Sequence, residues 1–439
     1  MQETNKLSID DTYLVVRDNG GDALVHTDTF AEQKGFAKLL ADATGSAYRH
    51  MVGEKRVSAT KFGIRSGDLS DQSVKIQYAI DAIASDFGRG CLELPEGLIY
   101  LGAPIYLRDR ISLKGASMSG TFLNPTGDFD AIRIWSSFTG SAIGRTMISD
   151  LGIKWDSNSY SLGTGISIKA ESGINIWKPS IQNVQIYQPG LDGIAVLGDA
   201  TASVAEHILF NVEVTKFKRH GVNQNYYVYD AHCTQVFLDG GSGNSAGYGM
   251  YVQGGSGTYL HVHAVACGTN DGAGNYVGGG FRVDTNYSYF ANCHADRCAG
   301  NGFVIGGFGG APARRELTFE QCLGFNSGVY YPNVNDGAKT RTAANWKFGA
   351  LDTVTLNSCK AGKLGSEYAY ANGRGMSFES TDITQVKLND CKINENVIGV
   401  LINGGVDASK IITNDVDLLD NTADVSGTHA TAWTKEAIA

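Results

Sequence analysis

Polar and charged side chains recur at alternate positions of several short apolar segments, each of which follows a glycine. In one of these segments, Phe281 and Val283 are apolar. Because successive side chains of a strand point to opposite faces, Arg282 and Asp284 are predicted to face outward together, about 6.8 Å apart along the strand. A carboxylate and a guanidinium so placed could act on a sugar substrate. They could equally form a surface ion pair with no function.

The same alternation predicts further outward-facing groups on neighbouring segments. Met250 and Val252 are expected to point inward, which turns Tyr251 and Gln253 outward. The segments that begin at Gly221 and Gly375 repeat this pattern. The expected floor of a shared site is therefore formed by Asn223, Tyr251, Gln253, Arg282, Asp284 and Glu379.

Four connections between such segments are much longer than the others. The interval from an inward anchor to the next glycine is 9 residues from Val212 to Gly221, but 16 from Cys359 to Gly375. Long insertions that leave one corner of a repeat are expected to wall a groove. They could also be neutral decorations or contacts with sister subunits.

These long connections carry residue types that bind glycans, since aromatic faces stack on sugar rings and carboxylates accept hydrogen bonds from hydroxyls. Turn composition alone accounts for Asn and Asp but poorly for the tyrosines. The candidates at the tips of the connections are Asp239, Tyr248, Asp271, Tyr276, Tyr330, Tyr331 and Tyr368.

Two reactions fit these side chains. Glycoside hydrolysis needs two carboxyls about 5–9.5 Å apart, which Asp284 with Asp271 or Asp239 could supply. Glu379 is a fourth candidate acid, three repeats from Asp284 and so about 14 Å away. Elimination at a uronic acid instead needs a base and a cation for the carboxylate, which suits Tyr251 and Arg282. We expect no metal and no cofactor.

Composition excludes several classes of partner. The chain has 439 residues, a net charge of −9 and a pI of about 5.5, which argues against nucleic acid and anionic membranes. With 56 glycines and only 7 prolines, the sequence favours stacked strands with many tight turns. We also find no run of apolar residues long enough to span a membrane and no signal peptide.

An internal repeat indicates the architecture. Cys293, Cys322, Cys359 and Cys391 recur at about thirty-residue intervals, each after a polar break. Upstream, the predicted equivalents are Leu151, Val184, Val212, Cys233 and His263. A repeat of this length predicts a solenoid. We interpret the eight cysteines as small buried hydrophobes and the histidines near the anchors as packing residues, rather than as disulfides or a metal site.

The repeat divides the chain into four parts. Residues 1–57 are predicted to form a small attachment module, with a hairpin around Asn19-Gly20 and a helix at 29–40. Residues 58–145 contain a capping helix at 71–85 and the first coils. Residues 146–420 form the solenoid with its groove loops, and 421–439 form a tail. The apolar face of the capping helix consists of Val74, Ile76, Ala79, Ile80 and Ile83.

The start of the repeat resembles a known family. Phe62-Gly-Ile-Arg-Ser-Gly-Asp, Ser70-Asp-Gln-Ser-Val-Lys-Ile-Gln and Leu92-Glu-Leu-Pro-Glu-Gly97 are similar to the segment that caps the first coil of pectate-lyase-like β-helix proteins. Ile111-Ser-Leu-Lys-Gly-Ala116 fits the same pattern. This resemblance implies an all-β fold, a single-stranded right-handed parallel β-helix with an N-terminal capping helix. The superfamily includes lyases, hydrolases, epimerases and bacteriophage tailspikes.

The N-terminal segment Asp11-Thr-Tyr-Leu-Val-Val-Arg-Asp resembles the small modules that precede receptor-binding proteins of phage tails. This implies a tailspike-like depolymerase, a glycoside hydrolase that cleaves a bacterial capsule, exopolysaccharide or O-antigen. It also implies a homotrimer, contact with other phage tail proteins through the N-terminus, and a location in the virion or outside the cell. The alternatives are a lyase acting by β-elimination on a uronic-acid glycan and a non-catalytic glycan-binding adhesin.

Overall fold

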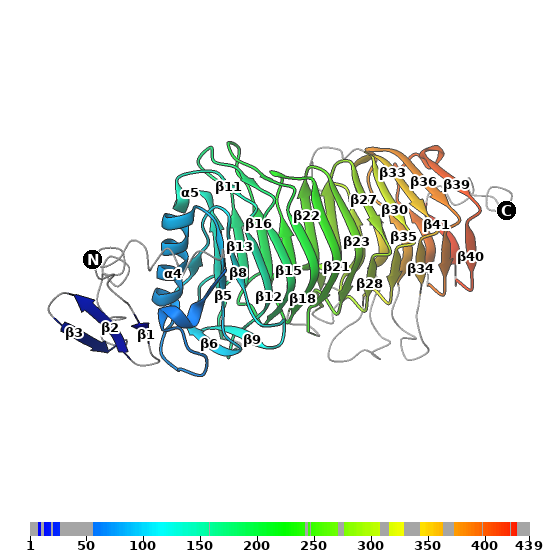
Figure 1. Cartoon of the computed structure of the whole chain (residues 1–439). Helices are drawn as coiled ribbons and strands as arrows, with labels where there is room; N and C mark the ends of the chain where they lie inside the picture. The colour runs from blue at the N-terminus through cyan, green and yellow to red at the C-terminus, as the bar shows by residue number, and fades with distance from the viewer. Residues whose placement is uncertain are drawn as a thin grey trace.

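The protein is a β-solenoid in which parallel strands of successive coils stack along one long axis (Figure 1). The computed structural model describes residues 56–157, 159–241, 245, 247–270, 276–307, 316–328, 343–362, 373–396, 398–421 and 423–427, and the backbone of three short strands between residues 8 and 26. The predicted solenoid is confirmed. Its right-handed sense, which the family resemblance implies, stays a prediction.

One wall of the solenoid is a sheet of 12 parallel strands, which we call the long sheet. Neighbouring strands come from successive coils, so each coil contributes one strand to it. The strands are β7 (Ile105–Tyr106), β10 (Ile132–Trp135), β13 (Ile166–Lys169), β16 (Ile194–Leu197), β19 (Val222–Gln224), β22 (Tyr248–Gly254), β26 (Gly279–Thr285), β29 (Asn301–Ile305), β32 (Ala344–Phe348), β35 (Arg374–Phe378), β38 (Ile398–Ile402) and β41 (Ala423–Gly427).

The other main wall, the bent sheet, turns a corner in the middle of each coil. β12 shows the bend, because Ile148 pairs with β8 and Ile153 pairs with β9. The strands of the bent sheet are β4 (Arg56–Ser58), β5 (Gly90–Glu93), β6 (Gly97–Leu101), β8 (Ile111–Lys114), β9 (Thr121–Pro125), β12 (Met147–Lys154), β15 (Ser180–Tyr187), β18 (Ile208–Thr215), β21 (Ala231–Asp239), β23 (Gly257–Val265), β27 (Ser288–Ala291), β28 (His294–Asp296), β30 (Leu317–Glu320), β31 (Leu323–Phe325), β33 (Leu351–Asn357), β34 (Lys360–Gly362), β36 (Ile383–Asn389), β37 (Lys392–Asn394), β39 (Ile411–Asn414) and β40 (Asp417–Leu419).

Several small elements complete the described chain. A short sheet joins the long sheet to the bent sheet in four early coils. It consists of β11 (Ile143–Gly144), β14 (Ile176–Trp177), β17 (Val204–Ala205) and β20 (Val228–Tyr229). The remaining elements are the antiparallel pair β24 (Thr269–Asn270) and β25 (Tyr276–Val277), the α-helix α5 (Ser136–Thr139), and the 3₁₀-helices η1 (Ala59–Phe62) and η3 (Ala408–Lys410).

A column of residues with left-handed backbone forms the corner inside the bent sheet. Their φ angles lie between 50 and 57°, a conformation that Asn and Asp tolerate better than most residues. The amide of Asn183 donates to Asp150 Oδ1 and that of Asn211 donates to Asn183 Oδ1, both at 2.9 Å. The column consists of Asp150, Asn183, Asn211, Gln235, His261, Asn292, Gln321, Ser358, Asp390 and Asp415.

The residue after each of these corners points into the core. Cys293, Cys322, Cys359 and Cys391 occupy this position and are fully buried free thiols, as predicted. The predicted register was wrong in two coils, because Val212 pairs with Val236, which pairs with Val262. Cys233 lies three residues before the corner anchor of its own coil, and His263 follows an anchor. Both coils contain other inward apolar residues at spacings that the sequence alone does not distinguish.

Aromatic rings fill the core of the later coils. Phe303 stacks on Phe281 at 4.6 Å and on Trp346 at 4.1 Å between ring centroids, nearly parallel in both cases. Each ring comes from the same position of consecutive strands of the long sheet. Because stacked rings at this spacing gain dispersion energy beyond their buried area, the column supports the sheet that carries the outward-facing polar residues.

The capping helix is α4 (Ser73–Phe87), which begins and ends two residues after the predicted bounds. Asp71 Oδ1 accepts hydrogen bonds from the backbone of Ser73 at 2.8 Å and of Gly102 at 2.6 Å, so it ties the helix start to the first coils. Ile76, Ile80 and the other predicted apolar residues are buried, with one exception. The prediction for Val74 was wrong: its side chain is 73% exposed because it lies on the far face of the helix.

The two ends of the described chain also bear on the predictions. At the N-terminus, β1 (Ser8–Ile9), β2 (Tyr13–Asp18) and β3 (Gly21–His26) form an antiparallel sheet, which confirms the hairpin around Asn19-Gly20. The helix predicted at 29–40 lies outside the described residues. At the other end, β41 pairs with β38 and so belongs to the long sheet, although it lies in the segment assigned to the tail.

The four long connections all join the same two walls. They leave the bent sheet after β21, β23, β31 and β34, and the chain returns to the long sheet at β22, β26, β32 and β35. The strands at which they begin belong to one stack and the strands at which they end belong to another, and only the short connection from β28 to β29 comes between them. The prediction that the long excursions share a single flank is therefore confirmed by the topology.

The left-handed corner gives a testable prediction for stability. Asn183→Ala removes the side-chain hydrogen bonds to Asp150 and Asn211. It also leaves alanine at a φ of 52°, where its Cβ makes the left-handed backbone unfavourable and no side-chain hydrogen bond offsets that cost. Asn183→Gly removes the same bonds without the conformational strain. We expect both variants to be less stable than the natural protein, and the Ala variant to lose about 1 kcal/mol more than the Gly variant. Urea unfolding followed by circular dichroism measures this order; equal stability of the two variants would contradict it.

Candidate functional site

The outer face of the long sheet brings five predicted residues together. Asn223 of β19 pairs with Tyr251 of β22, which in turn pairs with Arg282 of β26. In the next outward row, Gln253 pairs with Asp284. Because strands in a sheet lie about 4.8 Å apart, these side chains form a continuous patch across three coils. We call this patch, with the residues that contact it, the sheet-face cluster.

Arg282 and Asp284 form the charged centre of the cluster. Arg282 Nη2 lies 2.9 Å and Nε 3.2 Å from Asp284 Oδ2, so one carboxylate oxygen accepts both hydrogen bonds. The two side chains are 15% and 3% exposed. The pair is thus largely removed from water, unlike an ordinary surface ion pair, and its electrostatic interaction is correspondingly stronger.

Three aromatic rings lie beside this charge pair. The ring centroids of His220 and Tyr251 are 5.0 Å apart, and Tyr248 lies 5.9 Å from Tyr251. Burial raises the pKa of Tyr248 and of Tyr251, an effect that the positive charge of Arg282 partly offsets. Both phenols therefore keep their protons at neutral pH and are available as hydrogen-bond donors.

Tyr248 occupies a different place from the one predicted. The sequence assigns it to the tip of a long connection, but it is the first residue of β22, and its backbone N–H donates to His220 Nδ1 at 3.0 Å. In the neutral ring, Nε2 must then carry the proton. Burial lowers the pKa of His220 to about 4, with Asp192 and Arg219 exerting smaller, opposing effects. The imidazole is consequently neutral at physiological pH.

Asp192, Arg219 and His220 are site residues that sequence reasoning missed. Asp192 is fully buried, and Arg219 Nε donates to its Oδ1 at 2.8 Å. Asn223 Nδ2 donates to Asp192 Oδ2 at 3.0 Å, so the buried carboxylate fixes the orientation of the amide. The signal was present: Asp192 and His220 immediately precede the repeated glycine of their coils, a position to which the alternation pattern was not extended.

A second charged group lies further along the same face. Glu379 accepts hydrogen bonds from Ser377 Oγ at 3.0 Å and from Arg374 Nη1 at 3.3 Å, and Lys347 Nζ lies 2.7 Å from its other oxygen. The strand order β26, β29, β32, β35 places Glu379 three strands beyond Asp284. At about 14 Å, the two carboxylates are too far apart to act as a direct pair.

The structure does not bring Asp239 to Asp284. Asp239 ends β21 in the bent sheet, where its Oδ1 accepts a hydrogen bond from the backbone of Gly241 at 2.8 Å. Asp284 lies five residues into β26, about 17 Å from the edge at which the connections arrive. The prediction of an Asp239–Asp284 pair is therefore wrong, because the two residues lie on different walls of the coil.

The other candidates fall near or outside the described residues. Tyr276 lies in β25, where its hydroxyl is 3.5 Å from Asn301 Oδ1, and it is also close enough to Tyr248 to influence its pKa. Asp271, Tyr330, Tyr331 and Tyr368 lie outside the described residues.

The histidines near the corners lie on the bent sheet, away from the sheet-face cluster. His263 packs against His294 and Phe237, with ring centroids 5.6 and 5.4 Å apart. Burial lowers the pKa of both histidines. In the part of the chain that the structure describes, no three His, Cys, Asp or Glu side chains gather as metal ligands would, and no helix is long and apolar enough to cross a membrane.

Solved structures share the fold at low sequence identity. The N-terminal fragment of gene product 12 of bacteriophage Phi29 is 12% identical with a TM-score of 0.57; the match covers 89% of this chain and 71% of that one. Tailspike protein 2 of the Escherichia coli bacteriophage CAB120 is 15% identical with a TM-score of 0.54, over 95% of this chain and 49% of that one. The catalytic unit of an alpha-1,3-glucanase from Streptomyces thermodiastaticus is 13% identical with a TM-score of 0.50, over 85% of this chain and 69% of that one.

Neither the protein-family models nor the curated proteins include a match to this chain. The comparisons therefore show the fold alone: this chain shares a β-solenoid architecture with two phage proteins and with the catalytic unit of a glucanase. The chain spans about half the length of the CAB120 tailspike. Its activity has to be argued from its own side chains.

The buried His220 gives a prediction for pH dependence. Above pH 6.5 the ring is neutral in both folded and unfolded chains and contributes nothing. Between pH 6.5 and about 4 only the unfolded chain takes up a proton, so stability falls as the pH falls. The loss amounts to about 3 kcal/mol across this range.

In His220→Gln, we expect unfolding in urea to depend less steeply on pH between 6.5 and 4. His207, whose burial lowers its pKa to about 3, titrates in an overlapping range but is common to both proteins. Indistinguishable pH profiles for the two proteins would show that His220 does not resist protonation.

Proposed function

We propose that the protein is a tailspike-like depolymerase that binds and cleaves a bacterial surface polysaccharide along the outer face of the long sheet. One observation supports this most strongly: a largely buried Arg282–Asp284 pair lies among tyrosines on the wall that receives all four long connections. A structural role alone does not require polar and aromatic side chains in register on successive coils. Pockets with a few oriented charges among aromatic rings are typical of ligand sites.

The cluster provides the groups that a sugar chain needs. Tyr251 and Tyr248 offer ring faces and protonated hydroxyls, while the amides of Asn223 and Gln253 can donate to and accept from sugar hydroxyls. Gln253 Nε2 donates to Tyr251 Oη at 2.6 Å, which holds the phenol in place. A polysaccharide lying along the solenoid axis would meet these groups on consecutive coils.

Glycoside hydrolysis is the reaction that we propose first. Asp284 supplies one carboxylate, which the guanidinium of Arg282 holds in place through two hydrogen bonds to Oδ2. The second carboxyl, the acid, must then come from elsewhere. Asp239 and Glu379 are too distant, so of the original candidates we propose Asp271, in the connection that precedes β26.

A second candidate is β-elimination on a uronic-acid glycan. It is favoured by the composition of the cluster, which combines one carboxylate with a guanidinium, two phenols and a neutral imidazole. Arg282 would neutralise the uronate, the Asp284 carboxylate would take the proton from the sugar ring, and the protonated phenol of Tyr251 or Tyr248 would give a proton to the leaving oxygen. We further propose, by analogy with tailspikes, that the protein forms a homotrimer in the virion or outside the cell and attaches to other tail proteins through its N-terminal module.

The activity can be tested with Asp284→Asn. We expect turnover of a bacterial surface glycan to fall by about 10²–10⁴-fold, because the variant loses the charge needed for proton transfer or nucleophilic attack. Circular dichroism should remain unchanged. Asp382→Asn makes the same chemical change at an exposed carboxylate before β36 and should retain full activity.

Products distinguish the two reactions and the adhesin. New reducing ends without ultraviolet absorbance indicate hydrolysis, and the absorbance of an unsaturated uronate indicates elimination. Undiminished turnover in Asp284→Asn would remove this residue from the mechanism. Binding without either product, across a panel of capsule, exopolysaccharide and O-antigen preparations, would contradict the proposed cleavage and support an adhesin.

A further inference from the structure

A row of cations lies on a part of the solenoid that the proposed function does not use. Arg110, Arg145 and Lys178 occupy the same left-handed corner of successive coils, with φ angles of 54–55°. The backbone N–H of Arg110 donates to Gly144 and that of Arg145 donates to Trp177, so the corners are stacked in register. Arg89 occupies the equivalent position of the coil before, since the next residue, Gly90, pairs with Ile111.

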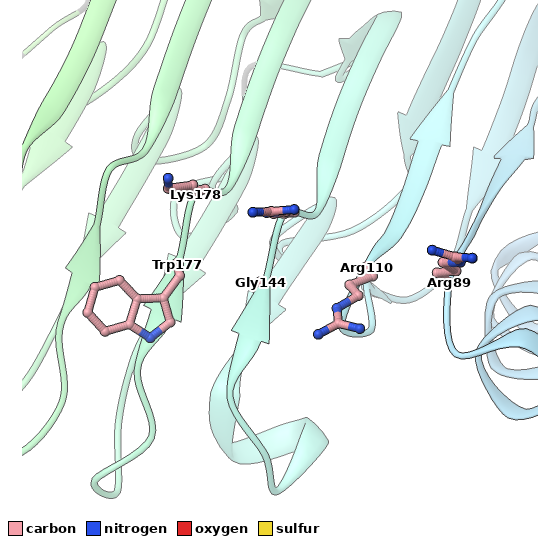
Figure 2. A pocket seen from close by; sticks show the side chains of 6 residues that line it. Arg89, Arg110, Gly144, Trp177 and Lys178 are labelled. Carbon is pink, nitrogen blue, oxygen red and sulfur yellow. The ribbon is translucent and has the colours of Figure 1, made fainter.

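These four cations line one cavity of about 720 Å³, together with Gly144 and Trp177. Figure 2 shows the labelled side chains in order along the axis, from Trp177 and Lys178 past Gly144 to Arg110 and Arg89. At about 4.8 Å per coil, the row of charges extends over about 14 Å. We call this cavity and its lining the basic flank.

The positive charge of the basic flank is only partly neutralised. Lys178 Nζ lies 2.8 Å from Glu206, and Arg110 Nε lies 3.5 Å from Asp109. Arg89 and Arg145 form no ion pair with any carboxylate among the described residues. The same corner carries Glu206 and Asp230 in the two coils that follow Lys178. The positive region is thus confined to the early coils of a protein whose net charge is −9.

Trp177 gives the basic flank an exposed aromatic face on which a ring of the ligand can stack. Its neighbours in the short sheet are Gly144 on one side and Ala205 on the other, so neither neighbour covers the indole with a large side chain. The residue is 45% exposed. An exposed indole beside guanidinium groups suits a ligand that combines ring faces with negative charges.

We propose that the basic flank is a second, non-catalytic site that binds a segment of acidic polysaccharide, with sugar carboxylates on Arg145 and Arg89 and a sugar ring on Trp177. The flank lies where the short sheet meets the bent sheet, whereas the long connections enter where the bent sheet meets the long sheet. The proposal rests on the proposed function only for the choice of a glycan as ligand. A second site on another face would keep a long polymer attached between cleavage events.

An acidic glycan accounts for the basic flank better than a nucleic acid does. The cations cover only four coils, and the protein beyond them carries excess negative charge that would repel a long polyanion with a charge on every unit. A short stretch of acidic glycan, whose charged units extend no further than the four cations, fits within the positive region.

The test measures binding of a galacturonic acid hexasaccharide by calorimetry to the full chain carrying Asp284→Asn, which blocks turnover. Adding Arg145→Asn removes a charge while keeping a residue suited to the left-handed corner, and adding Trp177→Ala removes the ring. We expect each change to weaken binding about tenfold, and raised salt to weaken binding to the parent protein. Lys360→Ala, at an exposed cation in a later coil, should leave the affinity unchanged.

Three results would overturn the proposal. The first is unchanged affinity for the hexasaccharide in both flank variants. The second is equal affinity for a glucose hexasaccharide, or tighter binding of a single-stranded oligonucleotide. The third is a changed oligomeric state in the flank variants, measured by light scattering, with glycan affinity retained, since this would assign the basic flank to contacts between copies of the chain.

The same experiment separates this proposal from the proposed cleavage. If the flank substitutions weaken hexasaccharide binding as expected while the natural protein has no activity on any glycan, only the proposed cleavage fails. If turnover at the cluster is normal and the flank variants bind as the parent does, only the second site fails.

Discussion

Backbone hydrogen bonds hold each coil to the next one. They determine where the side chains of the sheet-face cluster and of the basic flank lie. Because the parallel strands are in register, each residue lies about 4.8 Å along the axis from the equivalent residue of the next coil. Asn223, Tyr251 and Arg282 are 59 residues apart in sequence at most, yet they are direct neighbours because their strands pair one after another. The site therefore depends on the register of the solenoid rather than on any single loop.

The corners set that register. Residues such as Asn183 and Asn292 adopt a left-handed backbone at the same point of successive coils, and side-chain amides of neighbouring corners hydrogen bond to one another. Immediately inside each corner lies a small buried residue, which in the later coils is a cysteine. The same geometry, repeated where the short sheet meets the bent sheet, stacks Arg110, Arg145 and Lys178 into the basic flank.

The sequence predicts the parts of this structure that repeat. Alternation after each glycine correctly places Tyr251, Gln253, Arg282 and Asp284 on one face, because a strand has a fixed period of two. The long connections share a flank because they occur at the same point of the repeat. Even so, the predicted register was wrong at Cys233 and His263, because buried apolar residues occur on both sides of the true corner anchors.

What the sequence does not predict depends on contacts between coils and on the irregular segments. Asp192 and His220 could have been located by their position before the repeated glycine, but no local pattern reveals their hydrogen bonds to residues of the next coil. Asp239 shares a coil corner with the candidate groove but lies on another wall. Val74 shows the same limit for the capping helix, because the pattern identifies apolar residues without showing which of them the first coil covers.

The most direct test of the account is a crystal structure of the Asp284→Asn protein with a bound oligosaccharide of its substrate. The account predicts sugar rings along the outer face of the long sheet, in contact with Tyr251 and within hydrogen-bond distance of Arg282. An oligosaccharide bound elsewhere, with the outer face of β19, β22 and β26 unoccupied, would contradict it.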